Sequence, residues 1–265
     1  MKIRYILQTF LLSLFVLLHA CDEGDDATPD VSASFVLTAT DLPLGSTFEA
    51  VNTSQVGDVY EWNFGDGSPI QVDVSKTTMR YVYSLPGDYT VRLTVKNNSG
   101  EVLGNYKEEV SVFTYTVSRV ELLQLPSMKQ VLSDPEDENS ELIEVAWDAT
   151  NEGDAANPDL VTAFYNANTG EFSGISDFYE NFNTANLPVE FEVSPMIFTY
   201  ANYQFACFDL DDEDANEEST SEIMLVADIG DPFSQVVEEN GTFKITLGEY
   251  VNVYLEKVTT LDDLQ

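Results

Sequence analysis

The sequence predicts an all-β protein made of two successive β-sandwiches. Short segments alternate apolar and polar residues with a period of two, and Gly, Pro and Asn separate them. No segment after the first twenty residues has a convincing helical period. Aromatic residues make up 12% of the chain, which supplies apolar surface for folded cores and argues against disorder despite a net charge of −36.

Residues 1–20 are predicted to be a lipoprotein signal peptide. A basic start precedes the apolar run Ile6–Leu18, which is too short to span a bilayer comfortably. The run ends in LLHAC, which resembles a bacterial lipobox. The resemblance implies cleavage before Cys21 and attachment of lipid to that residue. The alternative is an ordinary secretory signal with an incidental Cys at its end.

Residues 21–31 are predicted to be a lipidated acidic tether. The sequence DEGDD directly after Cys21 resembles the signal that sends lipoproteins to the outer face in some Gram-negative bacteria. A solvated acidic linker is the simpler interpretation, and the two are compatible. We therefore expect a chain that is anchored by lipid in the outer membrane and exposed at the cell surface.

Composition excludes several classes of function. The only histidine, His19, lies in the signal, so the mature chain lacks Ser-His-Asp and Cys-His catalysis and histidine-bound zinc. Cys207 lies in an apolar segment, where we expect a buried thiol. No Lys or Arg occurs between Lys129 and Lys244, although twenty-seven Asp and Glu do. Such a surface repels nucleic acid and attracts cations or cationic partners.

Residues 32–113 are predicted to form the first sandwich. Tyr89–Val95 alternates apolar and polar residues, as a half-buried strand does. Val59–Pro69 is a strand that enters a tight turn, where Gly65 and Gly67 can adopt positive φ. A Pro-Gly turn precedes the strand that begins at Tyr89.

This segment resembles the PKD (polycystic kidney disease-like) domain. The resemblance rests on five sequences in order and spacing, namely SFVLTA, FEAVNTS, YEWNFGDGS, YVYSLPGDYTVRLTV and EEVSV. It implies an immunoglobulin-like sandwich in which Trp62 packs between the sheets and Gly65–Gly67 form a fixed turn. Tyr81 stands where many members have histidine. The resemblance also implies a spacer or contact module in a surface protein, and no chemistry.

Residues 114–265 are predicted to form the second sandwich. This part of the chain is long enough to bury a core of its own. Acidic turns separate its predicted strands, which lie near residues 115–123, 142–148, 160–167, 171–177, 189–194, 203–209, 222–229, 242–247 and 251–257.

Two acidic loops of this second part predict a calcium site. The loops cover residues 148–159 and 209–222, and loops at one end of a sandwich can meet. The arrangement resembles a C2 domain, in which Asp residues from two such loops hold calcium. The resemblance implies Asp148, Asp159, Asp209 and Asp211 as ligands, with Asp212, Asp214 or Glu217 completing the site. A solvated acidic loop without metal is the alternative, because acidic loops are frequent in a strongly acidic protein.

These features predict a non-enzymatic surface lipoprotein that binds a glycan or a protein. Three aromatic residues, Phe178, Tyr179 and Phe182, could stack on sugar rings, although packing within the fold is the simpler expectation for them. Two alternatives stay open. One is a secreted hydrolase that uses two carboxylates, and the other is an accessory subunit of an outer-membrane uptake complex. Nothing in the sequence identifies the ligand-binding residues.

Overall fold

The computed structural model describes residues 33–126, 128–133, 140–145, 147, 157–211, 220–260 and 262. In these residues the long elements are all β-strands, which confirms the predicted all-β class. The helical segments among them are one short helix, α2 (Pro232–Gln235), one 3-10 turn, η2 (Thr184–Asn186), and 3-10 geometry at Asp262. No helix in this part of the chain is long and apolar enough to cross a membrane.

The first sandwich consists of two facing sheets. One sheet has the strand order β1-β3-β6, and the other has the order β8-β7-β4-β5 with β2 parallel to β8. The strands are β1 (Phe35–Leu37), β2 (Asp41–Pro43), β3 (Thr47–Asn52), β4 (Val59–Asn63), β5 (Gln71–Asp73), β6 (Thr78–Val82), β7 (Gly87–Lys96) and the first half of β8 (Val102–Leu122).

The core of the first sandwich forms around Trp62, as the sequence predicts. Its side chain is fully buried, and its ring lies 5.1 Å from that of Phe35. Gly65 follows in the predicted turn with φ of +81°, and a Cβ there would lie 2.7 Å from the carbonyl oxygen of Thr90. Only glycine therefore fits this close approach of two backbones.

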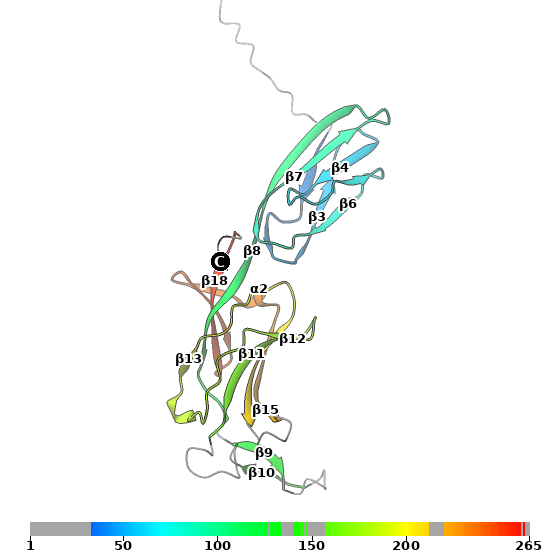
Figure 1. Ribbon diagram of the computed structural model, residues 1–265. Coiled ribbons are helices and arrows are strands. Elements are labelled where there is room, and N and C mark those ends of the chain that lie inside the picture. Colours follow the sequence, from blue (N-terminus) through cyan, green and yellow to red (C-terminus); the bar gives the residue numbers. More distant parts are fainter. Residues whose placement is uncertain are drawn as a thin grey trace, which may run out of the picture.

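Strand β8 belongs to both sandwiches (Figure 1). Its first half pairs with β7, from Val102 to Val112, and its second half pairs with β18, from Thr114 to Leu122. The expected division after residue 113 therefore falls inside one continuous strand, where no linker separates the two halves.

The second sandwich also has two sheets. One has the order β12-β11-β14-β15, and the other has the order β16-β17-β18-β8 with β13 on the far side of β8. Its strands are β11 (Leu160–Asn166), β12 (Glu171–Ser173), β13 (Val189–Phe191), β14 (Tyr203–Asp211), β15 (Thr220–Gly230), β16 (Val237–Glu239), β17 (Thr242–Leu247) and β18 (Val251–Val258).

One predicted strand of this part lies outside both sheets. The segment near 142–148 forms β10 (Leu142–Val145), which pairs with β9 (Lys129–Leu132) in a separate hairpin. The predicted strand near 115–123 is the second half of β8. The other predicted strands appear within a few residues of their expected places, and β9 and β16 were not predicted.

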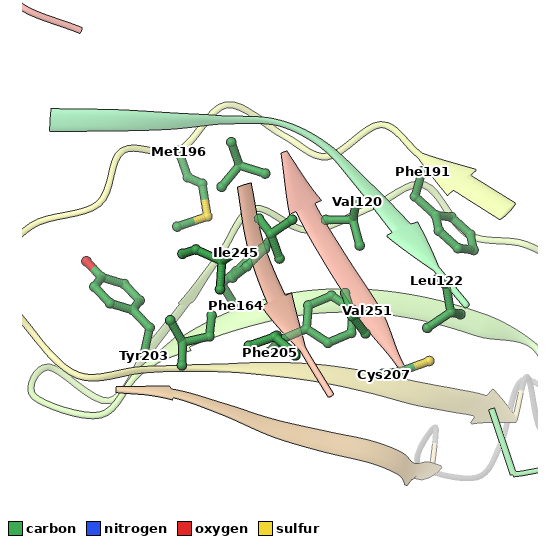
Figure 2. Close-up of a cluster of buried hydrophobic side chains, with 14 of the residues drawn as sticks. Val120, Leu122, Phe164, Phe191, Met196, Tyr203, Phe205, Cys207, Ile245 and Val251 are labelled. Atoms are coloured by element: carbon green, nitrogen blue, oxygen red, sulfur yellow. The ribbon is translucent and has the colours of Figure 1, made fainter. Parts of the chain in front are cut away.

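The core of the second sandwich lies between its two sheets (Figure 2). Alternate residues of each strand point into it, as the period of two requires. Figure 2 labels buried side chains from six strands and one loop, namely Val120, Leu122, Phe164, Phe191, Met196, Tyr203, Phe205, Cys207, Ile245 and Val251.

The two sandwiches also touch beside β8. The Tyr200 amide donates to the Leu44 carbonyl at 2.9 Å, and Ile197 packs against the core of the first sandwich. The Lys257 ammonium lies 4.1 Å from the centre of the Phe113 ring. Strand β14 begins beside this junction, so its last residues lie at the end of the second sandwich away from the first.

Candidate functional site

Two of the predicted calcium ligands lie together at that far end. Asp209 is buried in β14, and its Oδ1 accepts a hydrogen bond from the Asp159 amide at 2.7 Å. The Asp159 carbonyl accepts in turn from the Leu210 amide at 2.8 Å, and Asp159 Oδ1 accepts from the Asn181 amide at 2.6 Å. In the structure these carboxylates fasten the start of β11 to the end of β14 and to a neighbouring loop.

The other predicted ligands are placed only in part. Asp148, Asp212, Asp214 and Glu217 lie outside the described residues, and Asp211 is the last residue of β14. Among the residues that the structure describes, no three His, Cys, Asp or Glu side chains are grouped so that they could hold a metal ion. The calcium site therefore stays a prediction.

Cys207 is fully buried, which confirms the expectation from the sequence. Burial, together with the nearby charge of Asp209, raises the pKa of the thiol far above its ordinary value. The thiolate is the reactive form, so this residue serves as a small apolar group of the core.

Two of the three aromatic residues considered as sugar contacts are packing residues. Phe182 is buried, and the Tyr179 ring meets the Phe191 ring edge-on with 4.6 Å between the centroids. Only Phe178 is exposed, at 48% of its surface. The simpler expectation therefore holds for Tyr179 and Phe182.

A different set of side chains crosses the outer face of the four-stranded sheet. Strand pairing places one residue of each strand in a single row, namely Phe172 on β12, Tyr165 on β11, Gln204 on β14 and Asp228 on β15. Phe172 is 52% exposed, and its ring centroid lies 5.1 Å from that of Tyr165. The row thus places two aromatic rings beside an amide and a carboxylate.

Aromatic contact continues beyond this row. The Phe172 ring also lies 5.8 Å from that of Phe208, although the two residues belong to β12 and β14. Ala163 and Ala206 face each other between them, and their small side chains leave room for the rings. Ile223 pairs with Phe208 on the other side and is 62% exposed. The result is a continuous apolar surface on a face that borders solvent.

This outer face carries no positive charge. Strands β11, β12, β14 and β15 contain no Lys or Arg, and their acidic residues are Glu171, Asp209, Asp211, Glu222 and Asp228. A flat apolar surface with polar groups at one side and without cations suits a neutral or cationic ligand better than an anionic one.

The opposite sheet of the same sandwich has a polar outer face. Glu121 accepts hydrogen bonds from Asn252 at 2.8 Å and from the Tyr254 hydroxyl at 3.0 Å. These bonds hold the pKa of Glu121 below its ordinary value. The Arg119 guanidinium lies 3.9 Å from the centre of the Tyr254 ring and 3.3 Å from Glu190. The polar groups of this face thus form hydrogen bonds and charge contacts with one another.

Sequence reasoning missed the row that begins at Phe172. The sequence of β11, LVTAFYN, is apolar at positions that face in both directions, so its alternation does not reveal which side is solvent. The short strand β12 carries only one large apolar residue. The row can be recognised only after pairing between distant strands has placed these residues side by side.

Comparison with known proteins supports the resemblance of the first sandwich. Residues 32–110 match the PKD domain family. No curated protein matches the sequence. One similar solved structure is described as "Structural basis for the promiscuous specificity of the carbohydrate- binding modules from the beta-sandwich super family". The match covers 86% of this chain and 97% of that chain, with 12% identity and a TM-score of 0.28.

Proposed function

We propose that this chain is a lipid-anchored protein of the bacterial cell surface that binds a glycan without catalysis. The PKD sandwich acts as a spacer, and the second sandwich carries the ligand-binding face. The exposed ring of Phe172, which lies in a row with Tyr165, Gln204 and Asp228, is the observation that carries this proposal.

The chemistry of the row fits a neutral sugar. An aromatic ring offers an apolar face on which the C–H groups of a pyranose can stack. Gln204 provides amide donors and an acceptor, and Asp228 provides acceptors for hydroxyl groups. The absence of Lys and Arg from these four strands favours an uncharged glycan over an acidic one.

A glycan array with the soluble chain, begun after Cys21, tests the binding proposal. We expect Phe172→Ala to abolish the binding of any neutral glycan that the natural chain retains. Tyr200→Ala is the matched control, because Tyr200 is exposed to a similar degree, 56% against 52%, yet lies at the junction of the two sandwiches. Equal loss in both variants, or no neutral ligand for the natural chain, would contradict the proposal.

The surface location rests on the lipobox-like segment and needs its own test. We expect metabolic labelling with palmitate to modify the full chain in a Gram-negative host and to fail with Cys21→Ala. External protease should then remove the second sandwich from intact cells. Labelling that persists in Cys21→Ala would rule out the proposed anchor.

We further propose that calcium stabilises the loops beyond β14 and β11. Support comes from the acidic sequence after Asp211 and from the pairing of Asp159 with Asp209 at the same end of the sandwich. Carboxylates close in space repel one another, and a divalent cation offsets this repulsion.

A further inference from the structure

Strand β15 forms a long open edge of the four-stranded sheet. It pairs with β14, and in the described part of the chain no further strand pairs with its other side. It has 11 residues, whereas the other strands at sheet edges in this sandwich, β12, β13 and β16, have 3 each. The outer edge of a strand presents backbone donors and acceptors that another strand can use.

The side chains of β15 divide between the core and solvent. Met224 and Ile229 are buried and hold the strand against the opposite sheet. Ile223 and Val226 are exposed at 62% and 48% of their surface. The strand is therefore fixed in place while its outward face stays apolar, which is the condition for a partner strand to gain apolar contacts as well as backbone hydrogen bonds.

The edge has only part of the usual protection against pairing. Natural edge strands often carry Lys or Pro, and β15 has neither. Register shifts in its pairing with β14 interrupt the strand at two places, but four successive pairs between them, Leu225 to Asp228, keep one register. An added strand can follow this regular stretch.

Charge identifies the kind of partner that fits this edge. The four strands of the sheet carry five acidic residues and no basic one, whereas Arg119, Lys244 and Lys257 lie in the opposite sheet. A second copy of this chain would bring the same negative charge to the edge and be repelled. A neutral glycan lacks the repeating amide and carbonyl groups that form a strand ladder with this edge.

We propose that the outer edge of β15 receives an extended, basic segment of a partner polypeptide as an added strand. The segment contributes apolar side chains over Ile223 and Val226 and a Lys or Arg beside Asp228, whose side chain lies on the same outward face. This site shares Asp228 with the glycan-binding row, but the exposed ring of that row, Phe172, belongs to β12 at the opposite edge of the sheet. The two proposals can therefore fail independently.

A defined peptide tests the proposal on the soluble chain. The probe is a fluorescent peptide of about ten residues, the upper length of common strands, in which every second residue is Val, Val and Lys in turn, with Thr between them, so that Val and Lys share one face. One control peptide has Glu in place of Lys, and a second is the first peptide with alternate amides N-methylated. We expect fluorescence anisotropy to detect binding of the first peptide alone, weakening as salt screens the charges.

Hydrogen exchange locates the bound peptide. Amides within Glu222–Asp228 should exchange more slowly when the peptide is present, and those of β12 should not change. Slower exchange at β12, or an unchanged rate at β15, would overturn the proposal. Equal binding of the N-methylated peptide would do the same, because the contact would then be electrostatic without strand pairing.

Matched substitutions complete the test. We expect Ile223→Lys and Val226→Lys each to weaken peptide binding about tenfold or more, since each adds a repulsive charge to the edge. Val237→Lys is the control, because Val237 is 53% exposed on the edge strand of the opposite sheet. Phe172→Ala should leave peptide binding unchanged. An equal effect of Val237→Lys, or no binding by the natural chain, would contradict the proposed site.

Discussion

The Tyr81 hydroxyl links the Gly65–Gly67 turn to the other sheet of the PKD sandwich. It donates to Asp66 Oδ2 at 2.6 Å and lies 2.9 Å from the Ser68 hydroxyl, and its ring stacks on Phe64 with 3.8 Å between centroids. The PKD resemblance places histidine here in many members. Tyrosine therefore keeps an aromatic ring and a hydrogen-bond donor at the position, and only the donor atom differs.

We expect Tyr81→Phe to lower the free energy of unfolding by about 0.5–1 kcal/mol at neutral pH, because the largely exposed contacts of the hydroxyl with Asp66 and Ser68 are lost while the ring stays. Burial alone would raise the pKa of Asp66, but the hydrogen bonds from Tyr81 and Ser68 lower it overall. The contribution of Asp66 to stability is thus present above the ordinary pKa of about 3.9 and is lost as pH falls through the lower folded value. Urea titrations at several pH values should show a smaller acid-dependent loss in Tyr81→Phe than in the natural chain.

Asp209 gives a second prediction at the scale of one residue. Asp209→Ala removes the acceptor of the Asp159 amide in a buried place, so we expect a loss of about 1–3 kcal/mol in the free energy of unfolding. Asp209→Asn keeps an oxygen acceptor and should lose less. If urea denaturation finds both variants equally destabilised, the charge of Asp209 matters more than its hydrogen bond to Asp159.

At the scale of the element, β14 and β15 must build an apolar core with one face while their other face and their ends border solvent. Their inward residues, among them Phe205 and Cys207, are apolar and build the core, while their outward residues and ends are acidic or exposed. Strand β14 remains regular through Asp211, so Asp209 pairs with Glu222 within the sheet. Any calcium ion must therefore find most of its ligands beyond the strand.

This placement makes the calcium prediction specific. We expect calorimetric titration to detect calcium binding to the soluble chain and a higher melting temperature in its presence. Both effects should vanish in the double variant Asp211→Asn, Asp214→Asn and persist in Glu171→Gln, which removes a charge from β12. An absence of binding at millimolar calcium would support the alternative of a solvated acidic loop.

At the scale of the whole molecule, β8 joins the two sandwiches into one extended body (Figure 1). Its middle residues take part in both: Val112 pairs within the first, and Thr114 pairs within the second and bonds to Phe198. If the chain is anchored at Cys21 as proposed, this continuous strand would hold the proposed binding face at a defined distance from the first sandwich.

The shared strand predicts that the two sandwiches are coupled in stability. Leu93→Ala leaves a cavity in the fully buried core of the first sandwich and should cost about 2–5 kcal/mol. We expect hydrogen exchange to become faster in β18 of the second sandwich as well, since β18 pairs with the second half of β8. Unchanged exchange in β18 would mean that the second sandwich is stable without the first.

The sequence by itself determined the class of fold, the PKD sandwich and most strands of the second sandwich. The period of two and the turn residues are local signals. The strand that contains Trp62 and the Gly65–Gly67 turn after it can therefore be recognised without knowledge of distant residues. Such local signals were enough to predict that the side chains of Trp62 and Cys207 are buried. Asp159 and Asp209 could be matched because the loops of a sandwich meet at its ends.

Only the tertiary structure decided which strands are neighbours and which faces remain open. The row from Phe172 to Asp228 joins four strands, and its register depends on pairing between residues far apart in the sequence, such as Tyr165 with Gln204. The continuity of β8 and the open edge of β15 likewise depend on where other strands end. Local patterns specify a strand and its inward face, but pairing is a property of the assembled sheets.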